Sequence, residues 1–247
     1  MYVVKINVTD LRSEPDFRSE RLNQALLGDE ANLLKRNKEW TFIQLCDGYK
    51  GWVQLSHLLK VGQVKKFTHV VKEGIVNVYQ KPHMKSEILT KVVFNTKLIV
   101  HKFQENFACI ELFAGYGWID RDELMSIKEQ KILSYNNIGE MIQLARRFVG
   151  VPYLWGGKTP FGFDCSGFIQ ALFDFFLIKI PRDTTDQIKI GKEVEGLLPG
   201  DLVFFPRHIG IYCGNDEFIH SSLTNGGVAT NSLNNKFLTA RRVICMT

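Results

Sequence analysis

The first half of this 247-residue chain contains an internal repeat with an offset of 67 positions. Leu11-Arg-Ser-Glu-Pro15 matches Val78-Tyr-Gln-Lys-Pro82, and, after a one-residue deletion, Gly51-Trp52-Val53 matches Gly117-Trp118-Ile119. Such self-similarity predicts two copies of one small domain. The domain boundaries that we expect are 1–62 and 63–127 for the two copies, 128–137 for a polar linker and 138–247 for a third domain.

Each copy carries short alternating segments that are separated by turn residues and end in a Gly-Trp strand. The alternating segments are 31–34 and 40–46 in the first copy, and 97–102 and 107–113 in the second. This pattern predicts a small β-barrel. Leu-Arg-Ser-Glu-Pro together with Asp-Gly-Tyr-Lys-Gly-Trp-Val resembles the bacterial SH3-like domains, so the resemblance implies an SH3-like barrel for each copy. The second copy matches that pattern less closely at its front.

A glycine-rich segment in the second half leads to a cysteine at the start of a predicted helix. Three glycines and a proline interrupt regular structure at 156–162, whereas the apolar residues from Cys165 onward have helical spacing. Asp164 is a residue type favoured at the N-cap of such a helix. In the first turn, unpaired backbone N–H groups and the helix dipole favour an anion. We therefore expect the Cys165 thiol to be shifted toward thiolate at neutral pH.

Two histidines follow the cysteine on predicted strands. The apolar or alternating runs are 201–205, 208–213 and 217–221. Turn residues separate these runs, which predicts an antiparallel meander. In a hairpin with a short turn, His208 and His220 lie across from each other, so His208 can contact Cys165 while His220 orients His208 through its other nitrogen. This arrangement is typical of a catalytic triad.

Three sequence blocks carry a resemblance to a known family. They are Tyr-Leu-Trp-Gly-Gly leading to Phe-Asp-Cys-Ser-Gly-Phe, then Leu-Pro-Gly-Asp-Leu-Val-Phe-Phe with His-Ile-Gly-Ile-Tyr, and then Phe-Ile-His. In order and spacing, the region from about residue 135 onward resembles the NlpC family of cell-wall cysteine peptidases. The resemblance implies an α+β chain in which a truncated papain-like domain follows the two barrels. It also implies Cys165 as nucleophile, His208 as base and His220 as third polar residue.

The resemblance implies further residues around the cleft. Tyr153 would lend its hydroxyl near the oxyanion site, Trp155 would line the cleft, and Ser166 belongs to the same group. Tyr153 and Trp155 are alternatively ordinary core aromatics. Arg182 and Thr184 lie in a segment that borders the cleft in resembling enzymes and are expected to bind substrate, although Arg182 alternatively bonds to carboxylates within the domain.

A carboxylate beside a catalytic thiol raises the thiol pKa, so Asp164 is expected to have a cationic partner. The N-cap role satisfies its hydrogen bonding but not its charge. In resembling enzymes with two SH3-like domains, the aspartate before the nucleophile meets the free α-amine of the substrate's L-alanine, together with a glutamate and a tyrosine of the first barrel. The matching positions are Glu14 and Tyr49, and the second copy has Lys81 in place of Glu14.

The activity implied by the resemblance is hydrolysis of the bond between γ-D-glutamate and the following diamino acid. The substrates would be peptidoglycan stem peptides or murein fragments with a free N-terminal L-alanine, cleaved through an acyl-enzyme without metal or organic cofactor. One alternative is an acyltransferase or amidase on the same scaffold. Another is a non-catalytic wall-binding protein, against which the intact Cys165, His208 and His220 argue.

Composition and charge bound the remaining possibilities. The chain is 45% hydrophobic and 23% charged, which is ordinary for a soluble globular protein. The net charge of +5 comes from dispersed basic residues rather than tracts, so we expect no nucleic-acid partner. No stretch approaches the ~20 apolar residues of a membrane span, and the N-terminal sequence lacks the pattern of a signal peptide. We expect a bacterial cytoplasmic monomer.

The five cysteines do not indicate a disulfide framework or a zinc site. They lie at positions 46, 109, 165, 213 and 245, with no close pair. An odd set of this kind suits a reducing compartment. Cys46, Cys109, Cys213 and Cys245 each lie in an apolar or alternating run, so we expect them to be small buried residues.

Overall fold

The chain forms two compact units in the computed structural model. The structure describes residues 1–63, 65–233 and 237–244. The units are Met1–Gln130, which holds both copies of the repeat, and Lys131–Thr247. The boundary between them falls inside the segment 128–137 that we predicted as a linker. Cys245, which we expected to be buried, lies outside the described residues.

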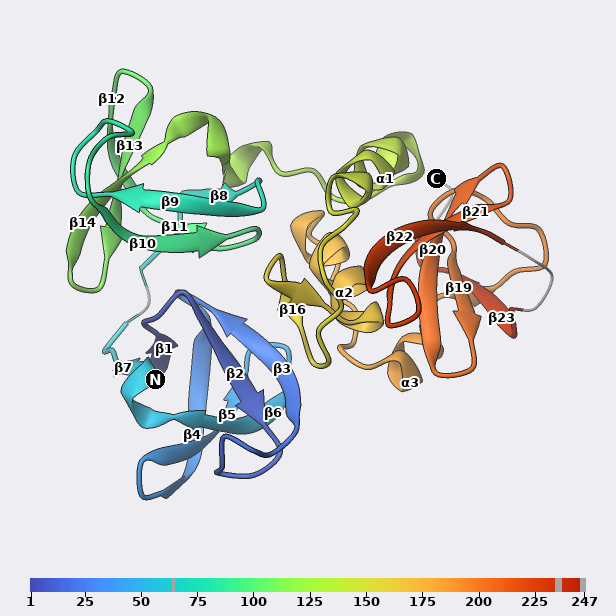
Figure 1. Cartoon of the computed structure of the whole chain (residues 1–247), viewed down its shortest axis with the longest axis horizontal. Coiled ribbons are helices and arrows are strands. Elements are labelled where there is room, and N and C mark those ends of the chain that lie inside the picture. Colours follow the sequence, from blue (N-terminus) through green and yellow to red (C-terminus); the bar gives the residue numbers. More distant parts are fainter. Residues whose placement is uncertain (64, 234–236, 245–247) are drawn as a thin grey trace. The chain divides into compact units, whose positions relative to one another are not determined.

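The first copy of the repeat folds into an antiparallel sheet with the strand order β3-β2-β6-β5-β4-β1-β7 (Figure 1). Its elements are β1 Tyr2–Val4, β2 Val8–Arg12, β3 Arg21–Leu26, β4 Glu30–Asn37, β5 Trp40–Leu45, β6 Lys50–Gln54, the 3-10 helix η1 Leu55–His57 and β7 Leu58–Lys60. Alternate residues of β2 and β5 face inward, and they place Leu11 and Ile43 in the core with Val53 of β6. No pairing among the described strands joins β3 to β7, so the closed barrel that we expected is not formed by strand pairing.

The second copy has a similar order of elements, except that one strand of the first copy is divided into two and a further 3-10 helix ends the copy. Its elements are β8 His69–Val71, β9 Ile75–Tyr79, β10 Ile88–Val93, β11 Lys97–Leu98, β12 Val100–Gln104, β13 Phe107–Leu112, β14 Gly115–Asp120, η2 Arg121–Glu123, β15 Leu124–Ser126 and η3 Ile127–Glu129. They form the sheets β10-β9-β14-β13-β12 and β11-β8-β15, both of which are open in the described pairings. In each copy the Gly-Trp strand, β6 or β14, is followed by a 3-10 helix and a short strand. The order of elements at the end of each copy thus follows the Gly-Trp match of the internal repeat.

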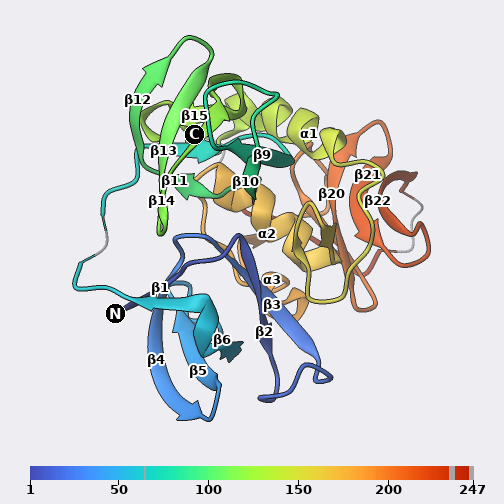
Figure 2. The ribbon, with the colours of Figure 1, turned by 60° about the vertical axis from the view of Figure 1, so that its left-hand side comes forward.

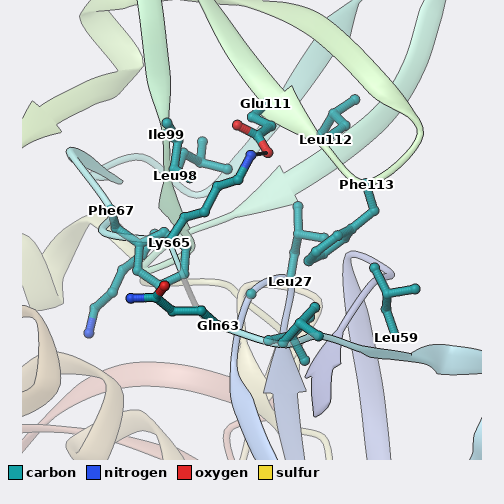
Figure 3. Close-up of a pocket in the computed structure, with 14 residues that line it drawn as sticks. Leu27, Leu59, Gln63, Lys65, Phe67, Leu98, Ile99, Glu111, Leu112 and Phe113 are labelled. Carbon is teal, nitrogen blue, oxygen red and sulfur yellow. Dashed lines mark hydrogen bonds and ion pairs between the residues drawn. The ribbon is translucent and has the colours of Figure 1, made fainter. Parts of the chain in front are cut away.

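A cavity of about 260 Å³ in the first unit is lined by residues of both copies (Figure 3). Leu27 and Leu59 of the first copy and Phe113 of the second contribute apolar walls, and the Lys65 ammonium binds the Glu111 carboxylate at 2.5 Å. Leu27 also packs into the hydrophobic core of the second copy. None of the residues that we predicted for catalysis or substrate binding lines this cavity.

The described residues of the second unit form an antiparallel sheet of strand order β18-β23-β19-β20-β21-β22 together with three α-helices. Its elements are η4 Tyr135–Asn137, α1 Ile138–Arg147, β16 Lys158–Thr159, β17 Gly162–Phe163, α2 Cys165–Phe175, α3 Thr184–Gln187, β18 Lys192–Glu193, β19 Leu202–Phe205, β20 His208–Gly214, β21 Glu217–Ser222, β22 Gly227–Ser232 and β23 Thr239–Arg242. The predicted meander is confirmed as β19-β20-β21. The glycine-rich segment, which we expected to be irregular, contains the short hairpin β16–β17.

Helix α2 packs against β20 and β21 and against β16 (Figures 1 and 2). Its residues Phe168, Ile169, Leu172 and Phe173 are fully enclosed, as expected for a helix that is apolar on nearly all sides. Even so, none of the helices in the described part of the chain combines the length and apolar character that crossing a membrane requires. The packing holds the first turn of α2 beside the sheet.

The cysteines outside the candidate site differ in exposure. Cys109 is buried, as expected, and Cys213 is half-buried. Cys46 is exposed, so the prediction is wrong for this residue. It follows the last residue of β5, where the chain turns toward β6, and its sulfur lies 3.8 Å from the carbonyl oxygen of Glu30.

Candidate active site

Cys165 is the first residue of α2, as the spacing predicted. The side chain of Asp164 caps the helix, because its Oδ1 accepts the backbone N–H of Gly167 at 2.6 Å. A Cβ atom at position 167 would collide with the carbonyl oxygen of Gly157 in the preceding loop. Because residue 167 is a glycine, the first turn of α2 can lie directly against the glycine-rich loop.

The guanidinium of Arg182 binds the capping carboxylate of Asp164 through both oxygens. The Nη1–Oδ1 distance is 3.0 Å and the Nη2–Oδ2 distance is 2.6 Å. Nη1 also donates to the Ser166 hydroxyl at 2.9 Å, and the Gly156 N–H donates to Asp164 Oδ2 at 3.0 Å. The cation that the sequence argument required for Asp164 is thus present within the second unit. This contact agrees with the expected alternative in which Arg182 binds carboxylates within its own domain.

The sulfur of Cys165 lies in a buried environment, and only 8% of the residue is exposed. Thr184 Oγ1 lies 3.8 Å from it, and the backbone N–H groups of Ser166 and Ile209 are within hydrogen-bonding reach. Ile209 directly follows His208 on β20, so the sulfur lies beside the strand that carries the predicted base. The Ser166 hydroxyl is engaged with Asp164 and Arg182, and its backbone N–H faces the sulfur.

The expected shift of Cys165 toward thiolate is wrong for this structure. Burial raises the pKa of the thiol, and the adjacent Asp164 carboxylate raises it further. The Thr184 contact and the two backbone N–H groups lower this pKa but do not reverse the net direction. Loss of hydration outweighs the effect of the helix start because the sulfur is enclosed. The resting group is a thiol that needs a base.

The two histidines form a hydrogen-bonded pair. His208 Nε2 lies 2.5 Å from His220 Nδ1, and His220 Nε2 lies 3.0 Å from the amide oxygen Oδ1 of Asn231 on β22. Burial lowers the pKa of His208 to about 4, with His220 adding to the shift, and burial lowers the pKa of His220 as well. Both imidazoles are therefore neutral at neutral pH, and a neutral imidazole can accept the thiol proton.

The register between β20 and β21 differs from the expected one. Ile211 pairs with Ile219, so His220 faces Gly210 and His208 is its diagonal neighbour on the same face. A Cβ atom at position 210 would lie 2.6 Å from the Phe218 ring and 3.2 Å from His220 Cβ. Gly210 therefore leaves room for the Phe218 ring and for His220 Cβ on the facing strand. The register makes the two histidines diagonal neighbours, and the glycine opposite His220 leaves that side of the strand open.

Tyr153 is half-buried close to the cysteine. Burial raises the pKa of its hydroxyl to about 12, and the Asp164 carboxylate and the Cys165 sulfur, once ionised, add to this rise. The hydroxyl therefore stays protonated and can donate a hydrogen bond. Trp155 is 59% exposed and so is not a core aromatic, and its position in the cleft stays a prediction.

Glu14 and Tyr49 belong to the first unit. Glu14 is exposed, and the Tyr49 hydroxyl donates to the Leu22 carbonyl oxygen at 3.5 Å. Their part in substrate binding stays a prediction. Within the described residues, no group of three or more histidine, cysteine or acidic side chains is arranged to hold a metal ion.

Sequence reasoning missed Asn231 and the role of Gly210. Asn231 lies outside the three sequence blocks, in a polar strand whose register with β21 the residue pattern does not specify. Gly210 stands within the block His-Ile-Gly-Ile-Tyr. A glycine inside an otherwise apolar strand indicates a close approach, and that signal was available.

Comparison with known proteins finds matches for both halves of the chain. Residues 150–247 match the NlpC/P60 family, and residues 11–58 match the bacterial dipeptidyl-peptidase Sh3 domain. The chain is 27% identical over 223 residues to the gamma-D-glutamyl-L-lysine dipeptidyl-peptidase of Bacillus subtilis (strain 168), covering 83% of this chain and 73% of that protein. It is 37% identical over 140 residues to a probable endopeptidase of Haemophilus influenzae, covering 53% of this chain and 86% of the relative.

A solved structure shows the same fold. The crystal structure of an NlpC/P60 family protein from Bacillus cereus ATCC 10987 matches this chain with a TM-score of 0.88 and covers 99% of both chains. The two sequences are 23% identical, so this likeness concerns the fold alone.

Proposed function

Since the chain belongs to the NlpC/P60 family and is a cysteine peptidase, we propose that it hydrolyses the bond between γ-D-glutamate and the following diamino acid in peptidoglycan stem peptides. The observation that carries the proposal is the position of Cys165 at the start of α2. Its sulfur is within reach of the backbone N–H of Ile209, the residue after His208, and His208 is hydrogen-bonded to His220 on the next strand. The relative from Bacillus subtilis, which is named for the γ-D-glutamyl-L-lysine bond, supports this choice of bond.

The reaction begins with a thiol and a neutral imidazole. His208 accepts the Cys165 proton as the sulfur attacks the amide carbon, and the amide oxygen becomes an oxyanion. Backbone N–H groups at the start of α2 and the Tyr153 hydroxyl are the donors proposed to stabilise that oxyanion. The protonated His208 then gives its proton to the leaving amine, the C–N bond breaks, and the γ-D-glutamyl group remains on the sulfur as a thioester.

Water completes the cycle. His208 accepts a proton from water, the resulting hydroxide attacks the thioester, and the carbon–sulfur bond breaks. The products are the dipeptide L-Ala-γ-D-Glu and the diamino acid with a free amino group. His208 returns the proton that it took from water to the Cys165 sulfur. His220 orients His208 throughout through the Nδ1···Nε2 contact. No step calls for a metal ion or organic cofactor.

The free α-amine of L-alanine is proposed as a determinant of specificity. Asp164, Glu14 and Tyr49 stay the predicted partners of that amine, and Arg182 and Thr184 stay predicted to border the substrate. Because Arg182 already balances the charge of Asp164, the aspartate does not require a substrate amine for electrostatic reasons. A substitution of Glu14 therefore tests recognition of the amine more directly than a substitution of Asp164, whose charge Arg182 already balances.

Product analysis tests the proposal. The enzyme is incubated with synthetic L-Ala-γ-D-Glu-L-Lys and with the peptide that has diaminopimelate in the third position, and the products are separated by mass spectrometry. We expect L-Ala-γ-D-Glu and the free diamino acid from at least one peptide. Release of alanine, transfer to an added amine in place of hydrolysis, or binding without cleavage would each overturn the proposed reaction.

A further inference from the structure

Asn231 ends a chain of polar contacts that starts at the catalytic histidine. It lies on β22, where Phe218 pairs with Asn231 and His220 pairs with Ala229, so Asn231 is a diagonal neighbour of His220. The amide oxygen Oδ1 lies 3.0 Å from His220 Nε2, on the side of the ring opposite the His208 contact. Two hydrogen-bond contacts thus connect His208, His220 and Asn231, which lie on the adjacent strands β20, β21 and β22.

The direction of each hydrogen bond follows from the chemistry of the amide. An amide oxygen only accepts hydrogen bonds, so His220 Nε2 must carry the ring hydrogen. A neutral imidazole carries one ring hydrogen, so His220 Nδ1 has a lone pair and accepts from His208 Nε2–H. His208 is also neutral, and its hydrogen is on Nε2. The lone pair of His208 is therefore on Nδ1.

We propose that Asn231 is a positioning residue that fixes both histidines in the Nε2–H tautomer and so makes Nδ1 of His208 the base for Cys165. The inference rests on the proposed function only for its consequence in catalysis, because the tautomers themselves are a property of the resting protein. Without Asn231, each ring is free to carry its hydrogen on either nitrogen, and only one arrangement leaves a base for the thiol.

The neutral amide also suits a base better than a carboxylate would. An aspartate at position 231 would accept the same hydrogen bond, but its negative charge would favour the imidazolium form of the pair. Burial of both rings acts in the opposite direction and keeps them neutral. Asparagine thus sets the orientation of the pair without adding a proton to it.

Nitrogen NMR of the resting enzyme tests the tautomers directly. In protein labelled with ¹⁵N-histidine, the two signals are assigned with His208→Gln and His220→Gln. We expect both rings to show a protonated Nε2 and an unprotonated Nδ1 at pH 7. In Asn231→Leu, which has a similar side-chain size but no acceptor, His220 should show a mixture of tautomers, whereas Asn231→Asp should keep Nε2–H. Parent-like histidine signals in Asn231→Leu would overturn the inference.

Kinetics test the consequence for catalysis. We expect Asn231→Leu to lower kcat about 10- to 100-fold with KM changed less than about threefold, because a wrong tautomer removes base assistance. Asn231→Asp should recover part of that loss. Thr230→Leu, at the exposed neighbouring position, is the matched control and should keep parent kcat. Equal kcat in Asn231→Leu and Thr230→Leu would contradict a positioning role.

The two readouts separate the two proposals. If Asn231→Leu does not fold, as judged by its circular dichroism spectrum, Asn231→Ala replaces it in both experiments. A parent enzyme that shows the Nε2–H tautomers but cleaves no stem peptide would overturn the proposed function and leave the tautomer assignment standing. A parent enzyme that cleaves the peptide but shows Nδ1–H on His220 would overturn the role of Asn231 alone.

Discussion

The Arg182 guanidinium binds both carboxylate oxygens of Asp164, at 3.0 and 2.6 Å. Asp164 directly precedes Cys165, and its charge raises the pKa of the thiol. Arg182 is only 3% exposed, so this ion pair is shielded from water. Arg182, 18 residues further along the chain, thus balances the negative charge that Asp164 places beside Cys165.

Breaking this ion pair should destabilise the second unit. Arg182→Gln leaves a buried carboxylate without its cation, and removal of one partner of such a pair typically costs ~3–5 kcal/mol. The double variant Asp164→Asn/Arg182→Gln should recover part of the loss, since neither charge then remains. The measurement is urea unfolding, with Lys189→Gln as control because its ion pair with Asp186 is exposed. Equal stability of Arg182→Gln and Lys189→Gln would contradict the assigned role.

The enzyme should stay active to an unusually low pH, so the acid limb of its pH–rate profile should fall near pH 4. His208 must be neutral to accept the thiol proton, and burial, with His220 adding, lowers its pKa to about 4. A lowered histidine pKa keeps the base form present as the pH falls. We predict that kcat/KM is halved near pH 4 rather than near the ordinary histidine value of ~6.5. Circular dichroism at each pH confirms that the protein remains folded. A half-maximal rate near pH 6.5 would count against a buried neutral pair.

A methyl group at position 210 should disrupt the histidine pair. In Gly210→Ala the new Cβ would lie 2.6 Å from the Phe218 ring, 3.0 Å from the Ile219 carbonyl oxygen and 3.2 Å from His220 Cβ. The Phe218 ring must therefore shift, and its centroid lies 4.5 Å from that of the His220 ring, so the shift should displace His220. We expect kcat to fall by about 10²-fold, on the scale of lost base assistance. Gly139→Ala is the matched control, because a Cβ there meets nothing within 4 Å. Parent activity in Gly210→Ala would show that the diagonal contact does not depend on this space.

Acetylation of the substrate amine should impair cleavage. We predict that N-acetyl-L-Ala-γ-D-Glu-L-Lys is cut with a kcat/KM at least roughly 10²-fold lower than that of the free peptide, because charged partners of the amine are left unsatisfied. Glu14→Gln should narrow this gap, while the exposed Glu87→Gln in the second copy should not. If the parent enzyme cuts both peptides equally, Glu14 and Tyr49 take no part in recognising the amine.

Local sequence patterns predicted the features that depend on neighbouring residues. The spacing of apolar residues after Cys165 predicted α2, the residue type predicted the Asp164 cap, and turn residues predicted the meander of β19, β20 and β21. The internal repeat likewise predicted that a similar order of elements recurs in the two copies. Each of these signals lies within a few residues of the structure that it specifies.

Features that depend on tertiary contacts were missed or wrong. The contact of Asn231 with His220 depends on how separate strands pack, which spacing does not encode. The contact of Arg182 with a carboxylate of its own domain, in contrast, was one of the two expected alternatives. The pKa of Cys165 rises because the folded sheet encloses the sulfur, although the helix start by itself favours an anion. The register of β20 with β21 is two residues from the expected one.

The rate of diamino acid release by Cys165→Ala tests the central claim most directly. The variant replaces one small side chain by another at the start of α2, so its circular dichroism should match the parent. Cys213→Ala is the control, because Cys213 is half-buried on β20 and has no role in the proposed reaction. We predict no detectable release from L-Ala-γ-D-Glu-L-Lys by Cys165→Ala and parent rates for Cys213→Ala. Release by Cys165→Ala at about a tenth of the parent rate would contradict Cys165 as the nucleophile, since covalent catalysis cannot proceed without the sulfur.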